Sequence, residues 1–335
     1  MRTWRGLAGS AALIPVPAKA ASPLSYLVGF GPKADPVVAL TWGMLLIAIG
    51  VVIAISLLVL GGVVGRGRHV DIASVPVERG GNGLRWIWIG VGVSSIPLVV
   101  ALVWTVSVLA AVSAPTGKPA VVIEVTGAQW WWKARYMDRD PARIFTTANE
   151  IHIPTGEPVQ IRLASADVIH SFWVPALGGK TDTIPGQTNV TWLQADMAGT
   201  YRGQCTEFCG WQHAHMGFLV LAQPPAQFRL WEDAQIKPAR PPTSPQEAAG
   251  KAAFEFHCGA CHTVRGSKAG GSVAPDLTHI ESRTTLAAVT LPHTIGALSG
   301  WIADPQAIKP GVHMPVMDIS GPELERIRSY LQTLE

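Results

Sequence analysis

Charged residues are absent from two long stretches in the first third of the chain, at 36–65 and 86–117. Each stretch is longer than the ~20 apolar residues that cross the hydrocarbon core of a bilayer. A hairpin buried in a soluble core would not need two uninterrupted spans of this length. The pattern therefore predicts a hairpin of two transmembrane helices, at about 37–64 and 86–112.

Basic residues flank these spans unevenly, which predicts the orientation of the hairpin. The connecting loop contains Arg66, Arg68, Arg79 and Arg85, whereas the outer flanks offer mainly Lys33 and Lys118. Short cytoplasmic loops of membrane proteins carry the excess of Lys and Arg. We therefore expect the loop in the cytoplasm and both termini outside.

The first twenty residues have the layout of a secretory signal peptide. Arg2 and Arg5 precede an apolar stretch, and Ala18-Lys19-Ala20 follows it in an A-x-A arrangement. An unstructured N-terminal tail is the alternative. A signal peptide at 1–20, followed by the hairpin within 21–113, agrees with an exported remainder of the chain.

Between 114 and 236 the pattern changes to short β-rich runs separated by Gly and Pro. The runs lie at 121–126, 130–136, 158–163, 190–194 and 216–221. Alternation and spacing of this kind predict a small antiparallel sandwich or barrel. Its loops would carry the chemistry.

One loop of this region concentrates metal-binding side chains: Cys205, Glu207, Cys209, His213, His215 and Met216. Its two cysteines and two histidines could formally supply the closed ligand set of zinc. A methionine close after the first histidine is instead typical of copper electron-transfer sites, and His170 would add a ligand from a remote loop. A disulfide between the cysteines is the metal-free alternative.

A proline-rich linker at 237–246 precedes a separate module at 247–335. Its signature is Cys258-Gly-Ala-Cys261-His262, the C-x-x-C-H of c-type haem attachment. The two thiols would form thioethers with the haem, and His262 would bind the iron. A thioredoxin-like motif or half a zinc site is the alternative, but no βαβ pattern surrounds the pair and no second cysteine pair follows it.

The distal side of such a haem needs a sixth ligand, and a methionine raises the reduction potential. Met314, directly before a proline, resembles the distal ligand of small bacterial cytochromes c. Met317 is the second choice and His313 the third. Pro275 resembles the residue whose carbonyl holds the proximal histidine. The pattern at 321–331 predicts a C-terminal helix against the haem.

These motifs together resemble subunit II of haem–copper cytochrome c oxidases. The loop matches that family's C-x-E-x-C-x3-H-x2-M pattern, and His170-Ser-Phe-Trp-Val-Pro matches its upstream motif. The resemblance implies a cupredoxin-like, all-β Greek-key sandwich at 114–236 with a dinuclear copper (CuA) centre. Cys205 and Cys209 would bridge the two copper ions. His170 and Met216 would complete one ion, and His213 with the carbonyl of Glu207 the other.

The same resemblance implies further roles. The side chain of Glu207 would face a Mg or Mn ion shared with subunit I, unless it is a simple surface charge. Trp130, in the run Gly127-Ala-Gln-Trp-Trp-Trp, resembles the residue that receives electrons from cytochrome c, although adjacent tryptophans also occur for packing alone. Many members carry a Glu before the second membrane helix, where this chain has Arg85, so a proton-uptake role here is in doubt.

Nearly everything after about residue 25, including an all-α class I cytochrome c domain, resembles subunit II of a caa-type terminal oxidase. The resemblance implies a bacterial plasma membrane protein with both outer domains in the periplasm. Electrons would pass from cytochrome c through haem c and copper to subunit I, which reduces O2 to water with proton translocation. Subunits I and III would be its partners.

Charge and three alternative classes of protein bear on this interpretation. Residues 114–236 carry 9 basic and 11 acidic side chains and residues 247–335 carry 7 and 9, which suits a positively charged donor and indicates no nucleic-acid binding. A quinol-oxidase subunit II would lack the two copper-loop cysteines. A copper-containing nitric oxide reductase subunit remains an alternative. A membrane-tethered copper chaperone would have no use for a covalent haem.

Overall fold

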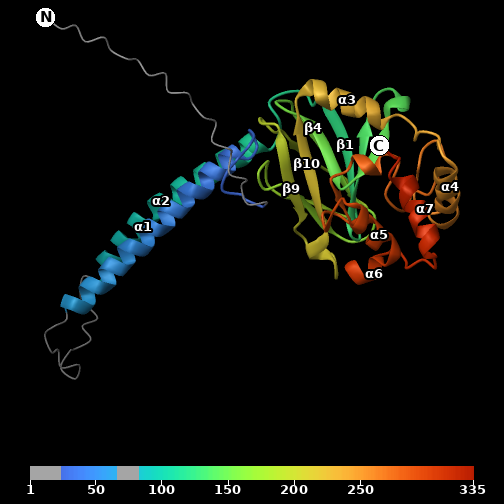
Figure 1. Ribbon diagram of the computed structural model, residues 1–335. Helices are drawn as coiled ribbons and strands as arrows, with labels where there is room; N and C mark the ends of the chain where they lie inside the picture. The colour runs from blue at the N-terminus through green and yellow to red at the C-terminus, as the bar shows by residue number, and fades with distance from the viewer. Residues whose placement is uncertain (1–23, 66–82) are drawn as a thin grey trace, which may run out of the picture.

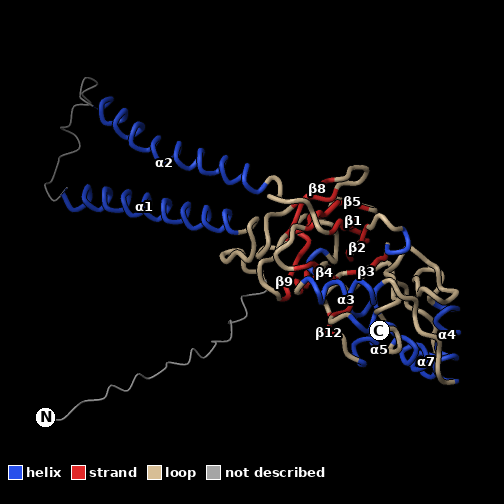
Figure 2. The backbone as a smooth tube through the Cα atoms, turned by 90° about the horizontal axis from the view of Figure 1, so that it is seen from above, coloured by secondary structure: helices blue, strands red, loops and turns tan. Residues whose placement is uncertain are grey.

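The computed structural model describes residues 24–65 and 83–335. The predicted signal peptide, together with Arg66, Arg68 and Arg79 of the connecting loop, lies outside the described residues. The described chain forms an apolar helical hairpin, a β-sandwich and a helical C-terminal domain (Figures 1 and 2). The C-terminal domain lies on the side of the sandwich remote from the hairpin.

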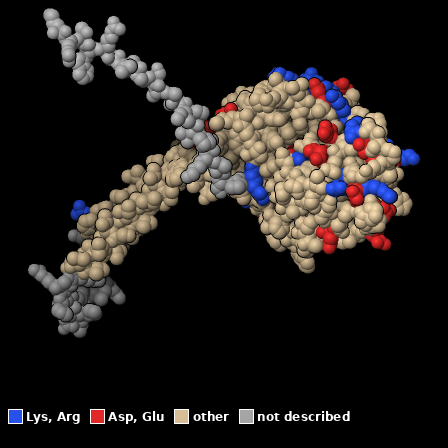
Figure 3. All heavy atoms as spheres, viewed as in Figure 1, with Lys and Arg blue, Asp and Glu red and all other residues tan. Residues whose placement is uncertain are grey.

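The hairpin consists of α1 (Asp35–Gly65) and α2 (Gly83–Val112), both long and apolar enough to cross a membrane. Their apolar side chains are largely exposed. Figure 3 shows the hairpin surface nearly free of charge, whereas acidic and basic side chains are scattered over the globular part. The helices approach closely where a Cβ at Gly43 would lie 2.3 Å from the Trp104 ring.

The outer end of the hairpin is fixed to the sandwich by polar contacts. Lys33, just before α1, donates to the hydroxyl of Thr191 (2.5 Å) and to the carbonyl of Trp192 (3.0 Å). The indole of Trp192 in turn donates to the carbonyl of Val112, the last residue of α2 (3.0 Å). Both membrane helices are therefore tied to the same strand of the sandwich.

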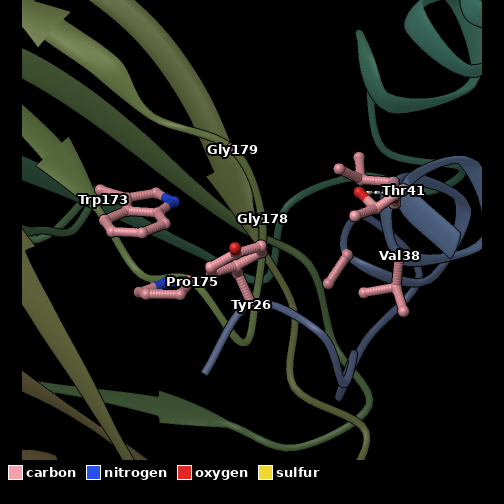
Figure 4. A pocket seen from close by; sticks show the side chains of 9 residues that line it. Tyr26, Val38, Thr41, Trp173, Pro175, Gly178 and Gly179 are labelled. Atoms are coloured by element: carbon pink, nitrogen blue, oxygen red, sulfur yellow. Dashed lines mark hydrogen bonds between the residues drawn. The ribbon is translucent and has the colours of Figure 1, made fainter. Parts of the chain in front are cut away.

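A cavity of about 160 Å³ lies at this junction (Figure 4). Tyr26, Trp173 and Pro175 line one side, and Val38 and Thr41 of α1 the other. The Thr41 hydroxyl donates to the carbonyl of Val37 (2.8 Å), so α1 presents mainly apolar surface to the cavity.

The sandwich has two five-stranded sheets, ordered β3-β2-β1-β5-β8 and β4-β10-β9-β6-β7. The strands are β1 (Val121–Ala128), β2 (Trp131–Met137), β3 (Phe145–Ala148), β4 (Glu150–Pro154), β5 (Val159–Ser165), β6 (His170–Trp173), β7 (Thr181–Thr183), β8 (Asn189–Leu193), β9 (Gly199–Cys205) and β10 (Gly217–Gln223). The sheets are mixed rather than antiparallel throughout, because β1 pairs with β5 and β4 with β10 in parallel. Alternation predicts which residues face inward, but not which strands become neighbours.

The sandwich core follows the alternation of the sequence. Buried and partly buried residues alternate in β1, β2 and β5. Trp132 is fully buried, and its ring meets Phe172, Phe218 and His170 edge-on at 5.4–6.0 Å between centroids. Helix α3 (Pro225–Gln235) covers β4, where Trp231 stacks on His152 at 3.9 Å. The aromatic core thus lies directly behind one of the predicted metal ligands.

The C-terminal domain has its own core around Phe254, Ile327 and Tyr330. Its elements are α4 (Pro245–His257), α5 (Ile295–Ala303), α6 (Pro305–Ile308), α7 (Gly321–Leu331), β11 (Thr285–Leu286), β12 (Leu291–Pro292) and a short 3-10 helix at Ile280–Ser282. The sandwich contains two further 3-10 helices, at Pro141–Arg143 and His213–His215. Ser320 and Glu323 form a capping box at the start of α7. Helix α7 packs on α4 so closely that a Cβ at Gly250 would lie 2.1 Å from the carbonyl oxygen of Arg326.

Candidate functional site

The two cysteines of the sandwich lie side by side as free, buried thiols. Cys205 ends β9, Cys209 follows in the next loop, and their sulfur atoms are 3.8 Å apart. A disulfide needs a bond of about 2.05 Å, so the structure contains a pair of thiols and not the disulfide alternative. The sulfur of Met216, fully buried, lies 3.8 Å from the sulfur of Cys209.

Two imidazoles complete this cluster. Nδ1 of His170, at the start of β6, is 4.0 Å from the sulfur of Cys205, and Nδ1 of His213 is 3.5 Å from the sulfur of Cys209. His170, Cys205 and Cys209 form a group that could hold a metal ion. His215 is exposed and its Nδ1 bonds to Gln212 instead (2.7 Å), so the four-ligand zinc arrangement with His215 is not assembled.

Glu207 presents its backbone and its side chain differently. Its carbonyl oxygen lies 3.3 Å from the sulfur of Cys205, within the cluster. The residue as a whole is exposed. The carbonyl is therefore near the predicted copper position, while the carboxylate is accessible from outside.

Asp167 orients the buried His170 ring. Its carboxylate lies 2.7 Å from Nε2 of His170 and accepts backbone hydrogen bonds from Gln129 and Val168 (both 2.7 Å). Burial alone would raise the pKa of Asp167, but these hydrogen bonds lower it overall. A carboxylate on one ring nitrogen turns the other nitrogen toward the sulfur atoms, as is common for metal-binding histidines.

The thiol pair is poised to supply thiolate. A hydrogen bond from Cys209 and, after it, the contact with His170 lower the pKa of Cys205 to about 4, despite burial. Holding the shared proton raises the pKa of Cys209. Thiolates, imidazoles and a thioether are soft or borderline donors that suit copper. The residues present therefore fit the metal that the sequence motif implies.

The haem-attachment motif lies where α4 ends. Cys258 caps α4 and is half-buried, whereas Cys261 is exposed. Nδ1 of His262 is 2.8 Å from the carbonyl oxygen of Pro275, as the sequence predicts. Burial lowers the pKa of His262, which favours the neutral ring that binds iron. With Nδ1 engaged, Nε2 is the nitrogen left for a haem iron.

The two predicted distal methionines are both half-buried, in the segment that follows α6. Gln306 holds this segment by donating to the carbonyls of Val312 (2.7 Å) and Met314 (2.8 Å). The preference for Met314 over Met317 stays a prediction.

Trp130 is buried beneath the chain's own C-terminal domain, with 6% of its surface exposed. Its indole nitrogen donates to the carbonyl of Cys209 (2.9 Å), and its ring lies 6.1 Å from that of His313. The Lys309 ammonium donates to its backbone carbonyl (2.8 Å). Trp130 thus connects the sulfur cluster with the segment that carries Met314.

A membrane-anchored electron-transfer protein is the class that this arrangement defines, with a soft-metal cluster in a cupredoxin-like sandwich and a c-type haem motif in a second domain. Two family models match the chain: "Cytochrome C oxidase subunit II, periplasmic domain" at residues 137–223 and "Cytochrome c" at residues 247–335. The chain is 31% identical over 293 residues to cytochrome c oxidase subunit 2 of Bacillus sp. (strain PS3), covering 81% of this chain and 80% of that one. It belongs to the cytochrome c oxidase subunit 2 family.

Other similar proteins cover less. Cytochrome c oxidase subunit 2 of Alkalihalophilus pseudofirmus is 38% identical over 221 residues, and the match spans 65% of this chain and 63% of that relative. The crystal structure of the periplasmic domain of subunit II of cytochrome oxidase of Bradyrhizobium japonicum is 32% identical, with a TM-score of 0.34, covering 36% of this chain and 96% of that domain. The two matched families imply copper in the sandwich and haem c in the C-terminal domain.

Proposed function

We propose that this chain is the subunit through which electrons enter a terminal respiratory oxidase. It would receive them from a cytochrome c and deliver them to a catalytic subunit I that reduces O2 to water with proton translocation, with subunit III as a further partner. Both outer domains would face the periplasm of a bacterial plasma membrane. The observation that carries the proposal is the buried cluster of two thiols, two imidazoles and a thioether behind Trp130.

The family motif suggests which residues would hold the two redox groups, and the observed distances support this assignment. Cys205 and Cys209 would bridge a dinuclear copper centre, and the other ligands would be His170, Met216, His213 and the carbonyl of Glu207. Cys258 and Cys261 would attach haem c, with His262 and Met314 as axial ligands. Both groups supply one-electron redox chemistry when bound. The exposed carboxylate of Glu207 would reach a Mg or Mn ion at the surface of subunit I.

The chain itself contributes rigidity and exclusion of water. Cys205, Cys209 and Met216 are buried at the end of the sandwich, and Asp167 holds His170 from outside the cluster. A site whose ligands are fixed in advance needs little rearrangement when its charge changes, which lowers the barrier to electron transfer.

The test is the metal and haem content of the full chain, matured with copper and haem c. We expect two copper ions and one covalent haem per chain, and an electron paramagnetic resonance spectrum in which one unpaired electron is shared by both copper ions. Cys205→Ser should abolish the shared-electron signal and leave the haem in place. A single labile copper ion that exchanges rapidly with a chelator would instead favour a copper-delivery protein.

A further inference from the structure

The side chain of Lys309 reaches from the C-terminal domain to the sandwich and is buried there. Only 2% of its surface is exposed, and its Nζ donates to the carbonyls of Trp130 (2.8 Å) and Ala287 (3.2 Å). The ion pairs found within residues 24–65 and 83–335 include none for Lys309. Because both acceptors are backbone carbonyls, the contact depends on position rather than on charge pairing.

Glu150 reaches in the opposite direction, from the sandwich into the C-terminal domain. It begins β4 and is 2% exposed. One carboxylate oxygen accepts hydrogen bonds from the backbone N–H of Thr284 (2.8 Å) and Thr285 (3.1 Å) and from both of their hydroxyls (2.7 and 3.3 Å). Each domain therefore inserts one buried side chain, Lys309 or Glu150, into hydrogen bonds with backbone and side-chain groups of the other.

The segment that follows Thr285 in the C-terminal domain has an unusual backbone. Ala287, Ala288 and Val289 have φ angles of 52°, 59° and 65°, a left-handed turn that residues with a Cβ rarely adopt. Its carbonyls point at the interface: that of Ala287 accepts from Lys309, and that of Ala288 accepts from the N–H of Gly217 in β10 (3.2 Å). Such conformations persist where the surroundings over-determine them, which indicates a specific interface and not a loose contact.

The same interface joins the two predicted redox loops. The segment from Lys309 to His313 covers Trp130, whose indole is bonded to the carbonyl of Cys209. Gln212, in the loop between Cys209 and His213, donates to the carbonyl of Pro310 (2.7 Å). The loop leading to Met314 therefore touches both Trp130 and the metal-binding loop.

We propose that Lys309 is a positioning residue for electron transfer between the two domains. It fixes the C-terminal domain on the sandwich in the one register that places the Met314 loop against Trp130, and Glu150 prevents rotation about that contact. An external cytochrome c then reaches the C-terminal domain and not Trp130. This inference rests on the proposed function, because it assumes that electrons pass from haem c to copper.

The test compares Lys309→Met with Lys268→Met in the full chain in detergent. Methionine keeps the length and apolar character of the lysine stem but donates no hydrogen bond, and Lys268 is an exposed lysine of the same domain. The first readout is amide hydrogen exchange at Thr284, Thr285 and Gly217, measured with and without bound metal. We expect faster exchange in Lys309→Met alone.

The second readout is the rate of haem-to-copper electron transfer after pulsed reduction of the haem. Because the rate of electron transfer falls exponentially with the distance between the two centres, we expect Lys309→Met to slow the transfer severalfold. The haem reduction potential and the copper spectrum should be unchanged. Lys309→Arg, which retains donors, should restore part of the rate.

A second variant guards against a misfolded Lys309→Met protein. Thr284→Val removes one donor to Glu150 on the other side of the interface, at an exposed position, and should also speed exchange at Thr285 and slow transfer. Unchanged exchange and transfer in both variants, with both centres loaded, would overturn the inference and leave the proposed function intact. Failure of the unsubstituted chain to bind copper or haem would overturn the proposed function itself.

Discussion

Replacing Gly127 by alanine tests the role of His170 without changing any predicted ligand. Gly127 lies in β1, and a Cβ there would be 2.8 Å from Cδ2 and 3.1 Å from Cγ of the His170 ring. Ordinary van der Waals contact begins at 3.4 Å, so ring and strand must separate by about 0.6 Å, the difference between 3.4 and 2.8 Å. The perturbation thus acts directly on the position of one imidazole.

The ring has little room to give way. Asp167 holds its Nε2 at 2.7 Å, and Trp132 meets it edge-on at 6.0 Å. Overpacking of a filled core costs about 1–3 kcal/mol, so we expect a loss of folding stability in that range. Disturbing the support of a ligating histidine typically costs about 10–100-fold in metal affinity, and we expect a loss of copper affinity of that size.

The assay is a copper titration against a competing chelator, together with chemical unfolding of the metal-free protein. Gly117→Ala is the matched control, because a Cβ at Gly117 would meet only Pro158, at 3.9 Å. The control should bind copper like the unsubstituted chain. Wild-type copper affinity and an unchanged copper spectrum in Gly127→Ala would refute the assignment of His170 as a ligand.

Three further predictions concern other parts of the site. Asp167→Asn keeps the size of the side chain but removes the charge facing His170, so copper affinity measured by chelator competition should fall about 10–100-fold while the fold is retained. Cys258→Ala should weaken covalent haem retention, seen by haem staining of the denatured chain, with the copper content unchanged, because the two domains have separate cores. Burial lowers the pKa of Lys309 from 10.5 to about 7. When the C-terminal domain is docked on the sandwich, Lys309 therefore binds fewer protons between these two pKa values than when the domain is detached. Docking of the domain should accordingly strengthen as the pH rises from 7 toward 10.5. Amide exchange of Thr284, corrected for its intrinsic pH dependence, measures this, and Lys309→Met should remove the trend.

Much of the sulfur cluster could be predicted from the sequence, because its ligands are close along the chain. Cys205, Cys209, His213 and Met216 belong to one loop, whose length alone brings them together. Nδ1 of His262 and the carbonyl of Pro275 also meet as the motif predicts. The alternation of apolar and polar residues predicted the positions of the β-rich runs, since successive side chains on a strand point to opposite faces.

Contacts between distant segments could not be predicted in this way. Lys309 and Trp130 are 179 residues apart, and Glu150 and Thr284 are 134 apart. The resemblance at the tryptophan run implies that Trp130 contacts an external cytochrome c, yet no local pattern indicates which surface of one domain covers the other. Asp167 was detectable, because it precedes His170 by three residues, but a carboxylate at that spacing has no meaning until a turn brings it to the ring.

Two physical effects hold the C-terminal domain on the sandwich: one determines how often the domains are in contact, and the other determines their relative orientation. The linker keeps the C-terminal domain near the sandwich, and tethering raises the effective concentration enough for a modest interface to remain occupied. Occupancy alone would permit many orientations, since apolar surfaces slide over one another at little cost. Buried Lys309 and Glu150 remove that freedom, because a buried polar group that loses its hydrogen-bond partners costs about 1–3 kcal/mol, and more if it is charged. Only the register that returns Lys309 to the carbonyl of Trp130 and Glu150 to Thr284 avoids that cost. Occupancy thus follows from the linker, and orientation from the hydrogen bonds of two buried side chains.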